Sequence, residues 1–184
     1  MTKHPLITRN SITVHETAWL KLEQDEVERT SDGTTYTYTY LSVAPSVMVV
    51  AVGPQGRVVI VKQYRYPTRR FSYELPGGGS GGDQPQHAAL RELEEETGYR
   101  AECIEKLGEF VTYCGLADEI CHVFLATDLT AGEQRLEKSE DITVHTVPYP
   151  ELLEMITQGQ FCDGMGLAAL HLARPHLDQM LGSG

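Results

Sequence analysis

Residues 74–99, "ELPGGGSGGDQPQHAALRELEEETGY", decide how the chain is read, because they join a glycine-rich loop to a carboxylate-rich segment. The loop holds five glycines within six positions. Pro85 suits the first turn of a helix, and Asp83 can cap that helix with Gln86 three residues on. Gly98 can end it in the left-handed conformation. The stretch therefore predicts a loop followed by a helix of about three turns.

Three carboxylates fall on one face of this predicted helix. At about 100° per residue, Glu95 and Glu96 lie within about 60° of Glu92. All three border the apolar stripe that contains Ala89 and Leu93, which is the face expected to pack on the core. The carboxylates are therefore expected beside buried surface.

This acidic face has two interpretations. A run of glutamates is most often a solvated surface. However, like charges three and four residues apart destabilise a helix by about 0.2–0.5 kcal/mol per pair, and no lysine relieves them here. The helix dipole also favours cations, not acids, in the last turns. A hard divalent cation such as Mg²⁺ would offset the repulsion, and Arg91 can orient one of the carboxylates.

The glycines suggest a different kind of site, a glycine loop that binds the phosphates of a dinucleotide. Gly77-x-Gly79-x-x-Gly82 matches the dinucleotide-binding fingerprint between a strand and a helix. The match is weak, because a glycine run satisfies many patterns and no parallel βαβ unit follows it. No G-K-[ST] of a nucleotide-triphosphate loop is present either. The glycines are better explained as a tight turn that brings backbone close to a metal and a phosphate.

The rest of the chain reads as strands before this helix, and as strands and then helices after it. Residues 46–53 and 57–67 are β-branched apolar runs joined by "GPQG", which predicts a hairpin in a buried sheet. Helices are expected over 150–159 and 163–173, the second stopped by Pro175. This order predicts an α/β fold with a mixed sheet packed between helices.

A division into two parts is also expected. Residues 1–42 can form a small antiparallel β appendage, because the stronger core pattern begins only at Pro45. Residues 43–184 would then form the main domain.

Composition and charge limit the classes of function. The 184 residues are 41% hydrophobic and carry a net charge of −11, so nucleic acids are poor partners. No apolar run reaches the about 20 residues of a membrane helix, and the N-terminus lacks the apolar core of a secretory signal. We therefore expect a cytoplasmic protein without membrane contact. Four cysteines at irregular spacings predict reduced thiols.

Basic residues gather just before the glycine loop. Residues 57–73 contain five Lys or Arg residues and no acid. Such a run is typical of an edge hairpin whose charged side chains prevent it from pairing with another chain. It equally suits a phosphate-binding patch, and its position next to the acidic helix favours that second interpretation.

The glycine loop and the acidic helix together make the sequence resemble the Nudix hydrolase family. The family's box is G-x5-E-x7-R-E-U-x-E-E-x-G-U, with U apolar. This chain reads Gly77-x5-Asp83-x7-Arg91-Glu92-Leu93-x-Glu95-Glu96-x-Gly98-Tyr99. The segments "VKQYRYP", "FSYELPGG", "CGLADE" and "ITVHTVPYPELLEMITQGQ" look like the ADP-ribose pyrophosphatase branch, and together they cover most of residues 12–173.

The resemblance implies an α/β/α sandwich on a mixed sheet. It also implies Mg²⁺- or Mn²⁺-dependent hydrolysis of ADP-ribose or a related nucleoside diphosphate sugar. Glu92, Glu95 and Glu96 would be the metal ligands and Arg91 the orienting residue. A backbone carbonyl near Gly77 would complete the metal site.

The resemblance also suggests how the substrate is held. Arg65 would contact the diphosphate, and we expect Arg69, Arg70 and Glu74 to bind substrate beside it. Members of this branch are often dimers joined through their N-terminal strands, so a homodimer is expected.

A carboxylate is needed to take the proton from the attacking water. Glu119, in "GLADE", is the leading candidate, and Glu140 is the second.

Three departures from the family pattern stand out: Asp83 replaces a glutamate, the glycine loop is one residue short, and Cys114 replaces a proline common in ADP-ribose hydrolases. Open alternatives are a dinucleoside polyphosphate or coenzyme A substrate, and a non-catalytic sensor of nucleotide sugars.

Overall fold

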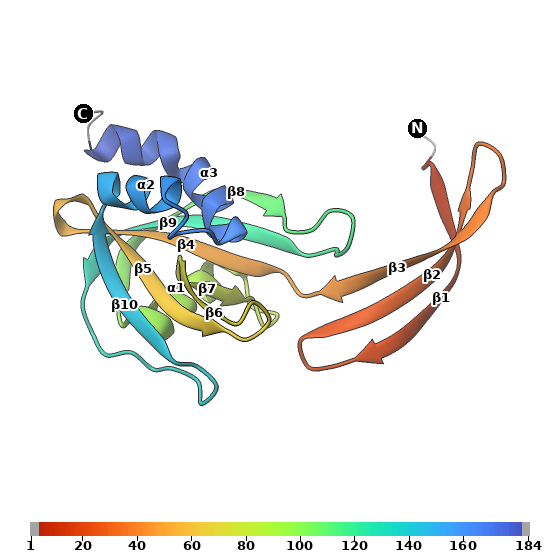
Figure 1. The fold of residues 1–184 in the computed structure, drawn as a ribbon, viewed down its shortest axis with the longest axis horizontal. Helices are drawn as coiled ribbons and strands as arrows, with labels where there is room; N and C mark the ends of the chain where they lie inside the picture. The colour runs from red at the N-terminus through yellow and green to blue at the C-terminus, as the bar shows by residue number, and fades with distance from the viewer. Residues whose placement is uncertain (1–3, 182–184) are drawn as a thin grey trace. The chain divides into compact units, whose positions relative to one another are not determined.

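A computed structural model describes residues 4–181 (Figure 1). Contacts divide the chain into two compact units. The first contains residues 1–44 and 111–120, and the second contains residues 45–110 and 121–184. The segment 111–120 therefore belongs to the same unit as the N-terminal strands, although it is far from them in sequence.

The larger unit is built on a seven-stranded mixed sheet. Its main path runs β10-β5-β4-β9-β8, while β6 pairs with β5 and β7 pairs with β4. The β4–β9 pair is parallel, and β4–β5, β5–β10, β5–β6 and β4–β7 are antiparallel. The elements are β4 (Ser46–Gly53), β5 (Arg57–Arg65), β6 (Arg70–Glu74), β7 (Gly77–Gly79), α1 (Pro85–Thr97), β8 (Arg100–Val111), β9 (Ile120–Thr130), β10 (Ile142–Pro148), α2 (Tyr149–Thr157) and α3 (Gly164–Leu181), with a short 3-10 turn (Pro54–Gly56) between β4 and β5.

Helices cover both faces of this sheet (Figure 1). On one face, Leu93 and two alanines of α1 pack against Val47 and Val49 of β4. On the other face, α2 and α3 contribute Leu152 and Leu177 to a larger core. Alternate residues of β4 enter the two cores, which explains why this strand is apolar along its whole length.

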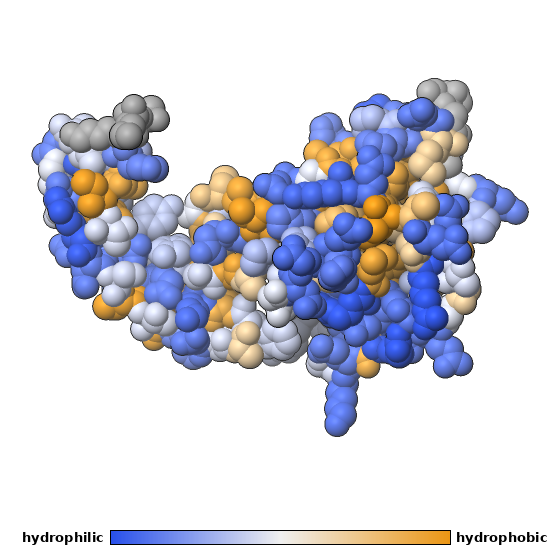
Figure 2. All heavy atoms as spheres, turned by 180° about the vertical axis from the view of Figure 1, so that it is seen from behind, coloured by the Kyte–Doolittle hydropathy of each residue, from blue (hydrophilic) through white to orange (hydrophobic). Residues whose placement is uncertain are grey.

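The smaller unit is a three-stranded antiparallel sheet in the order β1-β2-β3, with the segment 111–120 beside it. Its strands are β1 (Leu6–Glu16), β2 (Leu20–Arg29) and β3 (Thr35–Val43). In Figure 2, hydrophobic and hydrophilic residues are interspersed on its surface. Backbone of Leu41 bonds to the 111–120 segment, and Asp118 accepts hydrogen bonds from the Ser42 hydroxyl and the Val43 N–H.

The α/β class, the mixed sheet between helices and the N-terminal antiparallel strands agree with the sequence prediction. The expected hairpin between β4 and β5 is present. Gly98 ends α1 with a φ of 74°, as predicted. No helix within residues 4–181 is long and apolar enough to cross a membrane.

Two local predictions are wrong. Asp83 does not cap α1: the capping position is Gln84, which makes no side-chain capping bond, because Pro85 fixes the first helical residue only one position later. Pro175 does not stop α3, which continues to Leu181. A proline removes one backbone donor inside a helix but can be tolerated where the flanking turns are well packed, and Leu177 in the following turn is fully buried.

Candidate active site

Glu96 is the most deeply placed carboxylate of α1. It is 4% exposed, and its Oε2 accepts a hydrogen bond from the backbone N–H of Gly77 at 2.8 Å. The pKa of Glu96 is raised to about 8, mainly because the residue is buried. The hydrogen bond from Gly77 lowers this pKa, and the charges of Glu92 and Glu140 raise it. A carboxylate held in this way binds either a proton or a cation readily.

The glycine strand β7 lies directly against α1. A Cβ at Gly78 would come within 2.8 Å of the Glu92 carboxylate, and a Cβ at Gly77 would come within 2.2 Å of the Val47 carbonyl. Burial is also the main cause of the raised pKa of Glu92. The missing side chain of Gly78 therefore permits the close approach of β7 to α1, and that of Gly77 permits the pairing of β7 with β4.

Arg91 joins two of the predicted metal ligands. Its guanidinium contacts Glu92 and Glu95, each at 2.9 Å, and donates to the Gly79 carbonyl at 3.1 Å. Asp83 lies 3.8 Å from its Nε. Arg91 thus ties the two carboxylates to the glycine strand, which fits the orienting role expected for it.

Glu94 faces away from this group, because it lies about 200° round the helix from Glu92. It pairs with Arg100 at 2.7 Å and with Arg135. Within residues 4–181, no group of three His, Cys, Asp or Glu side chains is arranged to hold an ion by itself. Arg91 holds both Glu92 and Glu95, and the charge of Glu92 raises the pKa of Glu96.

The loop between β9 and β10 packs on the end of α1. The Gln134 side chain donates to the Glu96 carbonyl at 2.6 Å, and the Arg135 N–H donates to the Glu95 carbonyl at 2.9 Å. Glu140 is in this loop, and its charge raises the pKa of both Glu92 and Glu96. The second base candidate therefore lies within electrostatic reach of the acidic face.

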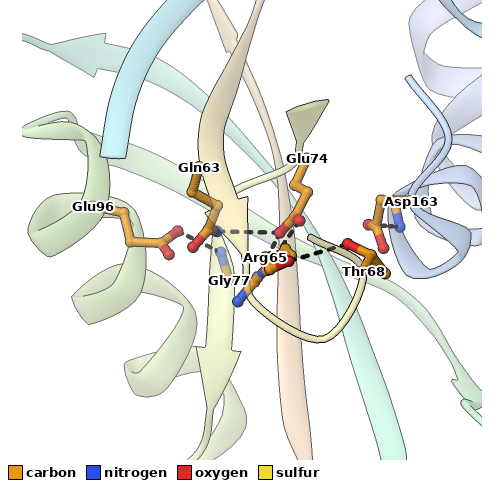
Figure 3. A network of polar contacts seen from close by, with 8 residues as sticks. Gln63, Arg65, Thr68, Glu74, Gly77, Glu96 and Asp163 are labelled. Carbon is orange, nitrogen blue, oxygen red and sulfur yellow. Dashed lines mark hydrogen bonds and ion pairs between the residues drawn. The ribbon is translucent and has the colours of Figure 1, made fainter. Parts of the chain in front are cut away.

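The β5–β6 hairpin places a cation beside the same face. Arg65 lowers the pKa of Glu96 by its charge. Its Nε donates to Glu74 Oε1 at 2.9 Å and its Nη2 to Glu74 Oε2 at 2.5 Å, while Gln63 donates to Oε2 at 3.1 Å (Figure 3). The hairpin thus presents an arginine that is already paired with a buried carboxylate.

The other two arginines of the hairpin are near its tip. Arg69 is in a left-handed conformation with φ of 55°, and its guanidinium lies 5.7 Å from the Tyr66 ring centroid. Arg70 pairs with Arg65 across the hairpin and is exposed. Within residues 4–181, neither pairs with a carboxylate as Arg65 does.

Glu119, the leading base candidate from the sequence, belongs to the other unit. Its carboxylate accepts a hydrogen bond from the Thr112 hydroxyl at 2.9 Å. The role of Glu119 as a base therefore stays a prediction.

Sequence reasoning missed Gln63 and Asp163. Asp163 caps α3 by accepting the Gly166 N–H at 2.6 Å, and burial is the main cause of its raised pKa. The charge of Arg65 lowers that pKa. An aspartate at the start of an expected helix is a capping signal, but no sequence pattern connects it with an arginine about a hundred residues earlier.

The fold and site together define an α/β/α protein in which a glycine strand and a basic hairpin flank a helix of carboxylates. The NUDIX domain model matches residues 42–162, and the chain belongs to the Nudix family. An ADP-ribose pyrophosphatase of Bacillus subtilis (strain 168) is 41% identical over 121 residues, which are 64% of this chain and 65% of that protein, just under two thirds. An ADP-ribose pyrophosphatase of Mycobacterium tuberculosis is 31% identical over 174 residues, which are 92% of this chain and 84% of that protein.

A solved structure described as an ADP compounds hydrolase matches with a TM-score of 0.84 and covers 98% of both chains. Its 19% identity supports the fold alone. The Nudix fold that the sequence predicted is confirmed. The two sequence relatives confirm the predicted pyrophosphatase branch.

Proposed function

We propose that this Nudix pyrophosphatase hydrolyses the diphosphate bond of ADP-ribose or a related nucleoside diphosphate sugar, releasing a nucleoside monophosphate and a sugar phosphate. One observation carries the proposal: the acidic face of α1 and the cation of Arg65 lie within electrostatic reach of each other. A site that combines carboxylates for a metal with an arginine for an anion suits a diphosphate. The two ADP-ribose pyrophosphatase relatives support the same substrate class.

The residues of α1 fit a hard divalent cation, Mg²⁺ or Mn²⁺. Glu96 is buried, and Glu92 and Glu140 repel it, so its ionised form lacks a compensating positive charge apart from Arg65. Glu92, Glu95 and Glu96 would hold the cation, with backbone near Gly77 beside them. When bound, the cation would offset the charge of the phosphate oxygens and make water more acidic.

The chain's own groups would orient the reactants around that cation. Arg91 would release or share Glu92 and Glu95 while remaining anchored to the Gly79 carbonyl. Arg65 would bind a phosphate oxygen, with Arg69 and Arg70 increasing the positive charge of the hairpin. A fixed arginine lowers the entropic cost of holding the diphosphate in line.

We infer that Glu140 takes the proton from water. Its charge acts on Glu92 and Glu96, and its loop is fastened to α1 by Gln134. These contacts favour Glu140 over Glu119, the candidate ranked first from the sequence. A base must reach the attacking water within hydrogen-bond distance or through one further water.

A substrate panel tests the proposed function. The protein with Mg²⁺ is incubated with ADP-ribose, other nucleoside diphosphate sugars, dinucleoside polyphosphates and coenzyme A. Release of the nucleotide product is followed, which is a nucleoside monophosphate from the sugars and adenosine 3',5'-bisphosphate from coenzyme A. Fastest release from ADP-ribose or another nucleoside diphosphate sugar is expected. Faster turnover of a dinucleoside polyphosphate or of coenzyme A would reassign the substrate. Ligand-induced thermal stabilisation without any turnover would instead indicate a sensor.

We also propose that β1–β3 joins two copies in a homodimer, with residues 1–42 as the dimerisation element and 43–184 as the catalytic domain. The support is an unusual amount of exposed apolar surface on this small sheet: Ile12 is 50% exposed, Val14 53% and Trp19 76%. Patches of this kind often mark an interface. Light scattering should give twice the chain mass, and Ile12→Glu should shift it towards a monomer; a monomeric wild type would overturn the proposal.

A further inference from the structure

The Glu74 carboxylate is already fully engaged by the protein. The residue is 6% exposed, Oε1 accepts from Arg65, and Oε2 accepts from Arg65 and Gln63 (Figure 3). A buried carboxylate with both oxygens occupied has little capacity to bind a further group. It would also repel a diphosphate. Direct contact with substrate, which the sequence suggested for Glu74, is therefore a poor description of its role.

The same contacts leave part of Arg65 available. The guanidinium carries five N–H donors, and Glu74 uses the edge formed by Nε and Nη2. The Arg65 side chain is still 50% exposed. Among the described residues, Nη1 donates to no protein acceptor. Its donors therefore remain free for an oxygen that arrives from solvent.

The main chain of Arg65 is fixed as well. Its carbonyl accepts the Arg69 N–H at 2.8 Å and the Thr68 hydroxyl at 3.2 Å, so the hairpin turn holds the Arg65 backbone. Beyond the backbone, a free arginine side chain has several rotatable bonds and about 2 kcal/mol of rotamer entropy. Glu74 removes most of that freedom through two parallel hydrogen bonds.

Register explains why Glu74 can do this. Glu74 lies opposite Val61, so its side chain shares a face with Val61, Gln63 and Arg65 of β5. Gln63 lies between the two charged residues and bonds to Glu74 from β5. The pair is therefore part of a rigid β-hairpin, and it faces α1. Glu96 and Asp163 add further negative charge near Arg65, Glu96 from α1 and Asp163 from the start of α3.

We propose that Glu74 is a positioning residue for the diphosphate: it holds the Arg65 guanidinium by one edge and so aims the other edge at a phosphate oxygen. The proposal rests on the proposed function of the site, and it assigns Glu74 no contact with substrate. The positive charge of Arg65 also compensates the negative charge of Glu74, which would otherwise repel the substrate. The expected effect of losing Glu74 is therefore on substrate binding.

Kinetics with ADP-ribose and Mg²⁺ test this role. Glu74→Gln should raise KM by about tenfold and change kcat by less than about threefold, as expected for loss of uniform binding. A purely structural role would lower the melting temperature or the active fraction and leave KM unchanged. Asp178→Asn is the matched control, because it breaks an acid–arginine pair with Arg174 on α3; its KM should equal that of the wild type.

A double-variant cycle shows whether Glu74 acts through Arg65. In an Arg65→Ala background, Glu74→Gln should raise KM no further. A full tenfold increase on top of Arg65→Ala, or an unchanged KM in folded Glu74→Gln, would overturn the proposal. If Glu74→Gln does not fold, Glu74→Asp takes its place, because it keeps the charge that balances Arg65 but shortens the reach.

Failure of the proposed function is distinguishable from failure of this inference. If the wild type releases no nucleoside monophosphate from ADP-ribose or from any other nucleoside diphosphate sugar of the panel, the proposed function fails. The same cycle is then measured by calorimetry as the Kd for ADP with Mg²⁺. A weaker Kd in Glu74→Gln that disappears in the Arg65→Ala background supports the positioning role. An unchanged Kd refutes it.

Discussion

Glu96→Gln is a sharp test of the acidic face, because the change removes one charge and almost no volume. The amide oxygen can still accept the hydrogen bond that the Gly77 N–H gives to Glu96. The substitution therefore isolates the cost of ionising a carboxyl that is 4% exposed. That cost should appear as a dependence of stability on pH in protein without metal.

The sign and size follow from the pKa. The carboxyl has a pKa of 4.5 as a free side chain and of about 8 in the folded protein, so the native state keeps its proton to higher pH than the unfolded chain. The stabilising effect of that proton is complete below pH 4.5 and is lost as pH rises towards 8. At 1.36 kcal/mol per pKa unit, the difference is about 5 kcal/mol, with a slope of up to about 1.4 kcal/mol per pH unit.

The assay is urea unfolding of wild type and Glu96→Gln in EDTA at pH 5, 6.5 and 8. The quantity of interest is the difference in unfolding free energy between the two proteins, because groups that do not interact with Glu96 contribute equally to both and cancel. The variant should gain several kcal/mol relative to the wild type between pH 5 and 8. Saturating Mg²⁺ at pH 8 should stabilise the wild type but not the variant. Parallel pH profiles would refute the claim that Glu96 is ionised at a cost, and equal Mg²⁺ stabilisation would refute its role as a ligand.

Three further changes have defined outcomes. Glu140→Gln should lower kcat by about a hundredfold or more, whereas Glu119→Gln should lower it little; the reverse order in steady-state assays would return the base role to Glu119. Gly78→Ala should raise the Mg²⁺ concentration needed for half-maximal activity, because a Cβ there meets a helix carboxylate at 2.8 Å, while Gly79→Ala, with nothing within 4 Å, should match the wild type. Leu93→Ala should cost about 2–5 kcal/mol in denaturant unfolding, because the side chain is fully buried; a cost below about 1 kcal/mol would contradict the described packing.

The parts of the site that sequence predicts well are those set by local rules. The direction of Glu92 and Glu96 follows from helix periodicity, and the end of α1 follows from the need for a left-handed residue at Gly98. The same periodicity turns Glu94 about 200° away from Glu92, where it pairs with two arginines. Such features depend on residues within one or two turns, so one segment contains all the information.

Features that depend on tertiary contact were harder to predict. The predicted Asp83 cap is wrong because Pro85 is the first helical residue, which puts the capping position at Gln84. Pro175 failed because a proline's cost of about 3 kcal/mol in a helix can be outweighed by burial, which the sequence does not show directly. The Arg65–Glu74 pair requires the register of a hairpin, since the two residues are nine positions apart along the chain.

The glycines and the carboxylates, which suggested two alternative binding sites in the sequence, form one structure. Successive residues of β7 each meet a different group of α1: the Gly77 N–H meets Glu96, the bare Cα of Gly78 makes room for Glu92, and the Gly79 carbonyl accepts Arg91. A strand with side chains would hold the helix further away and remove all three contacts. The short strand itself is held by pairing with β4, whose backbone lies too close to Gly77 for any Cβ. The position of the acidic face is therefore set by backbone, through a strand that must be glycine at 77 and 78 and is free of that requirement at 79.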